Sequence, residues 1–399
     1  MNVALLNDSF PPAIDGVANA VVNYAETIQK KYGNATVITP RYPHIVDNYP
    51  FEVYRYSSAK MTTKMPFRVG NPFSPILLKE LRAKDFDLLH VHSPFASSVM
   101  AREITLGRKS EIPTVLTYHT KFNIDIDKYV RIPSFNRISK AFMLNNINSA
   151  DEVWTVSNGT IENLREIGYE GEIIIMPNGT DFKKGKSSPE EIADIDRVYQ
   201  LKDEFIMLFV GRMMWYKNLE IILDSLKNLA DNGYNFKAFF IGEGPDRFSV
   251  EHYAKTLGIY DRTIFTGAIY DRKKVKAFFS RADLFLFPST FDTSGLVVKE
   301  AAACGCPSIL TDKSCAAEDV EDGVSGLLAK ENAEDFTKKV VEYINNQELR
   351  NRLKAGASEK LYRSWESCVD LAVERYNIVG ENHKSKKKTK TEIKYFTLK

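Results

Sequence analysis

The sequence is poor in cysteine and contains no long apolar run, and each shortage excludes a class of protein. Four cysteines in 399 residues are too few for a disulfide-stabilised scaffold. Cys304 and Cys306 have no histidine pair at the spacing of a zinc site, so we expect reduced thiols and no metal centre. No stretch of about 18 uninterrupted apolar residues is present to span a bilayer.

The start of the chain also lacks a secretory pattern, because an apolar strand pattern at residues 2–6 begins at once. We therefore expect a cytoplasmic location. A hydrophobic content of 44% with 27% charged residues is typical of a soluble globular protein. A chain of 399 residues is too long for one core and indicates two or three domains.

The small net charge of +2 conceals a basic carboxy-terminal tail. Residues 381–399 contain seven lysines against two glutamates, a net of +5, which leaves −3 for the rest of the chain. We expect this tail to be flexible, and either simply solvated or attracted to anionic lipid by about 1 kcal/mol per lysine near the surface. The body has no basic stripe interleaved with aromatic residues, so we expect no nucleic-acid partner.

Short apolar runs alternate with helix-length segments along the chain, which predicts an α/β fold of two doubly wound, Rossmann-like parallel-sheet domains. Helices fit between the runs, and a polar stretch at 182–189 is predicted to be a linker. The predicted strands are 3–6, 35–39, 52–56, 88–91, 114–118, 152–156 and 172–176 in the first half, then 205–210, 237–241, 263–265, 284–287 and 307–310.

The same pattern divides the chain into domains. We predict an amino-terminal, acceptor-binding domain at 1–180 and a carboxy-terminal, nucleotide-binding domain at 181–363. A helix at 364–380 is expected to cross back onto the first domain, and 381–399 is the basic tail. Ligands bind beyond the carboxyl ends of the strands in such sheets, so a cleft between the two domains is the expected site.

The most informative motif is residues 291–300, Phe-Asp-Thr-Ser-Gly-Leu-Val-Val-Lys-Glu. A buried strand precedes it and an apolar helix starts at its Ser294-Gly295 pair, so backbone N–H groups and the helix dipole are aimed at one point. A phosphate fits there, and Asp292 and Glu300 can accept hydrogen bonds from sugar hydroxyls. The alternative is that Asp292 caps the helix and Glu300 is simply solvated.

Three other loops follow predicted strands and carry candidate site residues. Gly16, at a helix start, allows close backbone approach to a ligand, or is an ordinary turn glycine. His119 ends a strand and either contacts substrate or is a hydrogen-bonded core residue. Arg212 and Lys217 flank another helix start, where both cations could meet a diphosphate, or form a surface charge pair. The fragment at 241–245 lacks a third glycine and predicts only a tight turn.

Together these motifs resemble those of the family-4 glycosyltransferases of the GT-B fold. The resemblance rests on the Asp292 and Glu300 spacing, on Gly211-Arg212 with Lys217, on the inter-domain element at 177–181 and on Trp365 near the end. It departs from the family at Asp292, where glutamate is usual, and this leaves the donor sugar open. An epimerase of the same fold and a non-catalytic binding protein are the rival interpretations.

The resemblance implies a role for each candidate residue. Glu300 would bind the ribose hydroxyls, Asp292 the sugar, and His119 the sugar near the reacting centre. Arg212 and Lys217 would neutralise the diphosphate, together with the backbone N–H groups of the helix start. The donor-binding set is therefore Gly16, Arg212, Lys217, Ala268, Ile269, Asp292, Ser294, Gly295, Leu296, Val297 and Glu300, with Ala268 and Ile269 against the base; His119, Asp292, Arg212 and Lys217 form the catalytic set.

The resemblance further implies a retaining hexosyl transfer without a metal or other cofactor. The expected donor is UDP-glucose or a related UDP-sugar, and the expected acceptor is a membrane lipid such as diacylglycerol; a cell-envelope polysaccharide or a soluble acceptor is the alternative. Segments 55–84 and 128–143 mix basic with apolar residues, including Met61, Met65, Phe67 and Phe73. They predict either peripheral binding at the inner face of the membrane or ordinary solvated faces.

Overall fold

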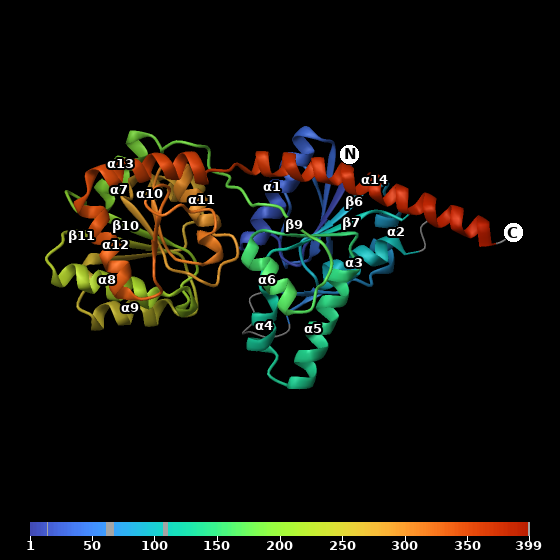
Figure 1. Ribbon diagram of the computed structural model, residues 1–399, viewed down its shortest axis with the longest axis horizontal. Coiled ribbons are helices and arrows are strands. Elements are labelled where there is room, and N and C mark those ends of the chain that lie inside the picture. The colour runs from blue at the N-terminus through green and yellow to red at the C-terminus, as the bar shows by residue number, and fades with distance from the viewer. Residues whose placement is uncertain (14, 61–67, 107–110, 398–399) are drawn as a thin grey trace. The chain divides into compact units, whose positions relative to one another are not determined.

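Two parallel sheets organise the chain, one in each of two units (Figure 1). The computed structural model describes residues 1–13, 15–60, 68–106 and 111–397. Unit 1 contains Met1–Asn178 and Trp365–Lys399, and unit 2 contains Gly179–Ser364. The predicted doubly wound α/β architecture is thus confirmed for both halves of the chain. Met61, Met65 and Phe67 lie outside the described residues.

The unit 1 sheet has the strand order β3-β2-β1-β6-β7-β8-β9, and every neighbouring pair is parallel. Its central strands are continuous apolar runs because helices cover both faces. Its strands are β1 (Asn2–Leu6), β2 (Asn34–Pro40), β3 (Glu52–Tyr56), β6 (Leu88–Val91), β7 (Thr114–Tyr118), β8 (Glu152–Thr155) and β9 (Ile173–Ile175), and β4 (Ser58–Ala59) and β5 (Val69–Gly70) form a separate antiparallel pair.

The helices of unit 1 connect these strands. The first begins at Asp15, whose side chain accepts a hydrogen bond from Ala18 N as an N-cap. They are α1 (Gly16–Lys31), α2 (Pro75–Ala83), α3 (Ala96–Thr105), α4 (Phe122–Tyr129), α5 (Pro133–Asn148), α6 (Asn158–Glu166) and α14 (Trp365–Thr397).

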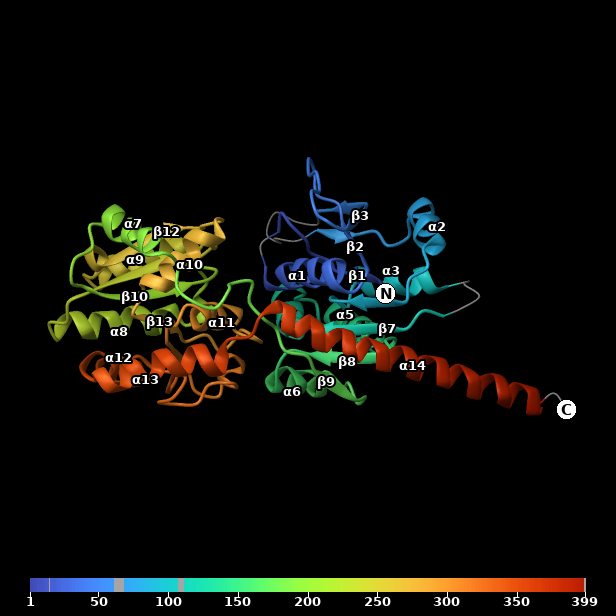
Figure 2. The ribbon, with the colours of Figure 1, turned by 90° about the horizontal axis from the view of Figure 1, so that it is seen from above.

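Helix α14 returns the end of the chain to unit 1, where it runs along α1 (Figure 2). Its apolar side chains, among them Val369, Ala372 and Tyr376, recur at a helical spacing and are buried. The prediction ended this helix near Gly380, before a flexible tail, whereas the structure continues it to Thr397. Lysine is a good helix former and no proline or glycine follows Gly380, which accounts for the longer helix.

The unit 2 sheet has the order β12-β11-β10-β13-β14-β15, again parallel throughout. Helices α8, α9 and α12 cover one face, and α7, α10 and α11 cover the other (Figure 1). The elements are α7 (Pro189–Tyr199), β10 (Phe205–Val210), α8 (Leu219–Asp231), β11 (Phe236–Ile241), α9 (Arg247–Thr256), β12 (Thr263–Gly267), α10 (Arg272–Arg281), β13 (Leu284–Phe287), α11 (Leu296–Ala303), β14 (Ser308–Thr311), β15 (Leu327–Ala329), α12 (Ala333–Asn345) and α13 (Gln347–Gly356).

Three differences from the predicted elements have local causes. Helix α7 follows the expected linker because Ser188 and Glu191 form a capping box at its start. Strand β15 was not predicted, since only three residues pair at the sheet edge. A π-helical turn at Ala357–Leu361, which was not predicted, follows α13.

Each sheet reverses its strand order at one point, between β1 and β6 in unit 1 and between β10 and β13 in unit 2. Loops on either side of such a reversal leave a crevice at the carboxyl ends of the strands, where ligands bind in this type of sheet. Among the residues described in these sheets and their helices, no helix is long and apolar enough to cross a membrane.

Candidate functional site

Lys217 and Asp292 meet where the strand order of unit 2 reverses. Lys217 lies in the loop after β10 and Asp292 in the loop after β13. Lys217 Nζ donates to both carboxylate oxygens of Asp292, at 2.8 and 2.9 Å, and Ser289 Oγ donates to Asp292 Oδ2 at 2.5 Å. The Lys217 side chain is only 11% exposed. Two residues that were predicted to bind different parts of one ligand therefore form a single, nearly buried ion pair.

Glycines hold the loop that carries Arg212 and Lys217 in place. Gly211 N donates to Ile241 O at 3.0 Å, and Gly242 N donates to Gly267 O at 2.9 Å. A Cβ atom on Gly242 would lie 1.9 Å from Gly211 O, and φ at Gly242 is +143°, so no other residue fits there. The fragment at 241–245, predicted only as a tight turn, is thus the support on which the Arg212 loop rests.

Arg212 itself is exposed, and its side chain has no hydrogen-bond or ion-pair partner among the described residues. No contact within the described part of unit 2 joins it to Lys217 or to Glu300. Its guanidinium is therefore available to an anion from solvent, whereas the charge of Lys217 is already balanced by Asp292.

Helix α11 begins beside these loops at Gly295, which serves as its N-cap with φ of +55°. A Cβ atom there would lie 2.7 Å from Ala316 Cβ, so the close packing requires glycine. The first turn of a helix leaves backbone N–H groups without intrahelical acceptors, and here the turn starts at Leu296 and Val297. These N–H groups belong to the segment Ser294 to Val297, which was predicted to bind an anion.

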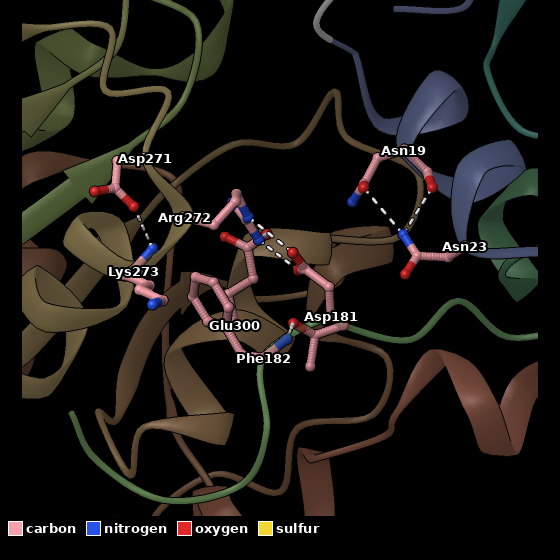
Figure 3. Close-up of polar contacts among 9 residues, drawn as sticks. Asn19, Asn23, Asp181, Phe182, Asp271, Arg272, Lys273 and Glu300 are labelled. Atoms are coloured by element: carbon pink, nitrogen blue, oxygen red, sulfur yellow. Dashed lines mark hydrogen bonds and ion pairs between the residues drawn. The ribbon is translucent and has the colours of Figure 1, made fainter. Parts of the chain in front are cut away.

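Glu300, one turn further along α11, is 7% exposed and binds Arg272 of α10 (Figure 3). Arg272 Nη2 donates to Glu300 Oε1 at 2.7 Å, and the same side chain holds Asp181. Burial raises the pKa of Glu300 above its usual range, and the charge of Arg272 acts in the opposite direction. Sequence reasoning missed Arg272, because it stands in a run of basic residues typical of a solvated helix start.

The remaining predicted donor residues, Ala268, Ile269 and Gly16, have no polar side-chain atoms. Ala268 and Ile269 follow β12 and are half-buried, with Ile269 packed against the core of unit 2. Gly16 is exposed at the start of α1 in unit 1. On the same face of α1, Asn23 Nδ2 donates to the backbone oxygen of Asn19 at 2.8 Å (Figure 3).

His119 lies at the carboxyl edge of the unit 1 sheet and belongs to a buried group of histidines. Its Nε2 lies 2.9 Å from His92 Nδ1, and the rings of His90 and His92 have centroids 3.9 Å apart. His90 Nδ1 lies 2.6 Å from the hydroxyl of Tyr376 and Nε2 lies 2.7 Å from Thr117 Oγ1. The His90-Val-His92 spacing at a strand end was the sequence signal for this group.

Burial determines the charge of these histidines. It lowers the pKa of His119 to about 3 and the pKa of His90 and His92 well below their usual range, so all three are neutral at pH 7. His92 Nε2 is buried without a partner in the described residues. A buried N–H without an acceptor is costly, so we assign the His92 proton to Nδ1, which donates to His119 Nε2.

Asp8, at the reversal point of unit 1, was also missed. Its Oδ1 accepts hydrogen bonds from Ser97 N at 2.9 Å and Ser97 Oγ at 2.8 Å, and its Oδ2 accepts one from Ser93 Oγ. Burial raises the pKa of Asp8, and these hydrogen bonds oppose the shift. The carboxylate caps the first turn of α3 from a neighbouring loop.

The chain resembles known proteins in sequence and in fold. Residues 14–184 match the model described as "Glycosyltransferase Family 4", and residues 191–360 match "Glycosyl transferases group 1". The chain is 25% identical to "Alpha-monoglucosyldiacylglycerol synthase" of Acholeplasma laidlawii, over 96% of this chain and 99% of that protein. It is 27% identical to "GDP-mannose-dependent alpha-mannosyltransferase" of Mycobacterium tuberculosis, over 95% and 97%.

Among solved structures, HepE of Anabaena in complex with UDP-glucose has a similar fold. The TM-score is 0.74 at 18% identity, and the match covers 94% of this chain and 99% of HepE. This identity is low, so the likeness concerns the fold.

Proposed function

Because the chain belongs to the glycosyltransferases with a family 4 amino-terminal region and a group 1 carboxy-terminal region, we propose a specific transfer reaction for it. In this proposal a hexose moves from a nucleoside-diphosphate sugar, UDP-glucose as first choice, to a hydroxyl group of a membrane lipid such as diacylglycerol. The anomeric configuration is retained, and no metal is required.

The observation that carries the donor half is the arrangement at the reversal point of unit 2. Arg212, whose guanidinium has no polar partner in the described part of the chain, and the buried ammonium of Lys217 follow β10. The first turn of α11 follows β13. A diphosphate accepts hydrogen bonds from all three kinds of donor. When it binds Lys217, the carboxylate of Asp292 is released from its charge partner and can accept hydrogen bonds from the sugar.

In the proposed mechanism these groups stabilise the leaving diphosphate. The acceptor oxygen forms a bond to C1 of the sugar as the bond from C1 to the phosphate oxygen breaks, and the electron pair stays on that oxygen. The acceptor proton moves to the same phosphate oxygen on the same face of the sugar. Arg212 and Lys217 balance the charge that develops there, which is electrostatic preorganisation.

The acceptor half rests on an apolar face of α5 in unit 1. Phe135, Ile138 and Phe142 lie three and four residues apart, so they share one side of the helix, and they are 59%, 61% and 43% exposed. Arg131 and Arg137 are exposed beside them. An apolar helix face flanked by cations suits the interface of an anionic membrane.

Two relatives support different parts of this proposal. The Acholeplasma protein, by its name, forms a glucosyldiacylglycerol, which favours a lipid acceptor and a glucose donor. The Mycobacterium protein, by its name, depends on GDP-mannose. Since Asp292 is one methylene shorter than the glutamate usual in the family, GDP-mannose is the second candidate donor, and a cell-envelope polysaccharide or soluble molecule is the second candidate acceptor.

A donor panel tests the reaction. UDP-glucose, UDP-galactose and GDP-mannose are each incubated with the protein, with and without diacylglycerol in phosphatidylglycerol vesicles, and nucleoside diphosphate and glycolipid are measured. We expect nucleoside diphosphate to be released from one of the three donors, and only when the lipid is present. A new nucleotide sugar formed in the absence of the acceptor would indicate an epimerase instead. Addition of EDTA should leave the rate of glycosyl transfer unchanged.

A vesicle assay tests the membrane surface separately. The double variant Phe135→Ser with Ile138→Ser should sediment much less with phosphatidylglycerol vesicles than the unaltered protein. Phe248→Ser, which removes an 82% exposed aromatic from α9 of unit 2, is the matched control and should sediment normally. A chain ending at Gly380 measures the contribution of the basic tail. Equal sedimentation of all variants would contradict membrane binding through α5.

A further inference from the structure

Arg272 joins three segments of unit 2 that are far apart in the sequence. Its Nε and Nη2 donate to the two oxygens of Asp181 at 2.9 and 2.5 Å, and Nη2 also donates to Glu300 Oε1 at 2.7 Å (Figure 3). Its guanidinium carbon lies 4.3 Å from the ring centroid of Phe182. The side chain is therefore held by a two-point carboxylate contact and by an aromatic ring, which fixes its orientation.

The contact differs from an ordinary surface ion pair on the side of Glu300. The Arg272 and Asp181 side chains are 43% and 27% exposed, whereas Glu300 is 7% exposed. A buried carboxylate without a partner is unfavourable, because it has lost its hydration. Arg272 is the only partner that the Glu300 side chain has among the described residues, so its charge depends on this one contact.

Only one of the two Glu300 oxygens is used. Oε1 accepts from Arg272, and Oε2 has no partner in the described part of the chain. The contact with Arg272 holds Oε1 and so restricts the positions that Oε2 can take. The site therefore contains a preoriented acceptor next to a helix start suited to phosphate, which is the arrangement that a nucleoside diphosphate needs for its ribose.

We propose that Arg272 is a positioning residue for the nucleotide, which orients the Glu300 carboxylate so that Oε2 accepts hydrogen bonds from the ribose hydroxyls. Asp181 has a supporting role, since its two-point contact orients Arg272. This inference rests on the proposed function, because it assumes that a nucleoside diphosphate binds unit 2. It concerns ribose recognition alone and does not depend on which sugar or acceptor is used.

The inference predicts that Arg272 acts on the ribose selectively. UDP or GDP, whichever the protein binds, is compared with its 2′-deoxy and 3′-deoxy analogues by calorimetry. In Arg272→Met we expect affinity for the ribonucleotide to fall about tenfold or more, as for loss of a hydrogen bond to a charged group. Affinity for the deoxy analogue that already lacks the contact should change little. Glu300→Gln should weaken ribose discrimination in the same way.

Two further variants separate positioning from folding. Asp181→Asn keeps Arg272 beside Glu300 but loosens its orientation, so it should show a smaller loss with the same selectivity. Lys274→Met removes a cation from the same turn of α10 and should bind like the unaltered protein. Thermal unfolding of every variant checks that the fold is intact.

The outcomes are distinguishable. An equal loss of affinity for the ribonucleotide and both deoxy analogues in Arg272→Met would overturn the inference in favour of a structural role. Tighter binding in that variant would also overturn it, since Arg272 would then cover the ribose site. If the unaltered protein binds no nucleoside diphosphate, the proposed function fails first.

Discussion

The ion pair of Lys217 with Asp292 shows how neighbouring charges at the site differ in their availability. Lys217 is nearly buried and its charge is balanced, while Arg212, five residues earlier, is exposed and unpartnered among the described residues. An incoming diphosphate can bind Arg212 without breaking any contact, but it must compete with Asp292 for Lys217. Substitution of Arg212 should therefore lower the activity without changing the stability of the protein.

We expect Arg212→Ala to lower turnover by about two orders of magnitude, by analogy with the loss of one oxyanion donor. The melting temperature should stay the same, because the exposed Arg212 side chain makes no hydrogen bond or ion pair with the residues that the structure describes. Turnover with the donor found in the panel and thermal unfolding are the two measurements. Lys330→Ala, another exposed cation of unit 2, is the control and should leave both unchanged. Near-normal turnover in Arg212→Ala would contradict its assigned role.

The motifs made Lys217, Asp292 and Glu300 visible from sequence, but not their partners. The pairing of Lys217 with Asp292 depends on the path of the 211–217 loop, which the contact of Gly242 with Gly211 determines. Arg272 looked like one cation of a solvated helix start, and only the burial of Glu300 distinguishes it. A spacing motif identifies residue types at loop ends; which side chains meet is decided by packing.

At the scale of elements, Tyr376 of α14 contacts the sheet of unit 1. Its hydroxyl lies 2.6 Å from His90 Nδ1 of β6, and its ring stacks on Trp154 of β8 with an interplanar angle of 10°. These contacts join the last helix to two strands that precede it by more than 200 residues. A single substitution can separate the contribution of the hydroxyl group to the free energy of unfolding from that of the aromatic ring.

Tyr376→Phe keeps the ring and removes only the hydroxyl. His90 Nδ1 then loses its partner in the core, and we expect the free energy of unfolding to fall by about 1–3 kcal/mol. Urea unfolding followed by circular dichroism measures the change. Tyr270→Phe removes a hydroxyl from a 74% exposed tyrosine and should have no effect. If Tyr376→Phe is as stable as the unaltered protein, the stacking of this ring on Trp154 is sufficient to hold α14 on the sheet.

Elements with long apolar runs were predicted well, since buried parallel strands such as β1 and β10 are apolar on both faces. Three of the shortest strands were not, because β15 and the β4–β5 pair have too few residues to form a pattern. The predicted end of α14, near Gly380, was wrong for a different reason. A lysine-rich segment was interpreted as disordered from its charge, although lysine has a high helix propensity.

At the scale of the whole molecule, the three neutral histidines of unit 1 make stability depend on pH. Their pKa values in the folded state lie below the usual 6.5, and that of His119 is about 3. The unfolded chain therefore binds more protons as the pH falls below 6.5. The stabilisation is complete above that pH and is lost progressively below it, by about 1.4 kcal/mol per pH unit for each histidine.

We expect the urea concentration at the unfolding midpoint to decrease as the pH is lowered from 7 to 5.5. Most carboxylates titrate below this range, so they should contribute little to the change. His92→Gln should reduce the slope of this fall, even if it lowers stability at pH 7. His252→Gln, at an exposed histidine of unit 2, should leave the slope unchanged. An unfolding free energy that does not vary over this range would contradict the lowered pKa values, because the folded and unfolded chains would then bind protons equally.

The assignment of α14 to unit 1 has a consequence for synthesis on the ribosome. The first 178 residues emerge early, but the helix that covers Trp154 and His90 is translated only after the whole of Gly179–Ser364. Domains fold as units during translation when all their parts are available. Unit 2 can thus reach its native state while one face of the unit 1 sheet is still uncovered, so we expect the nascent chain to need protection until α14 has emerged.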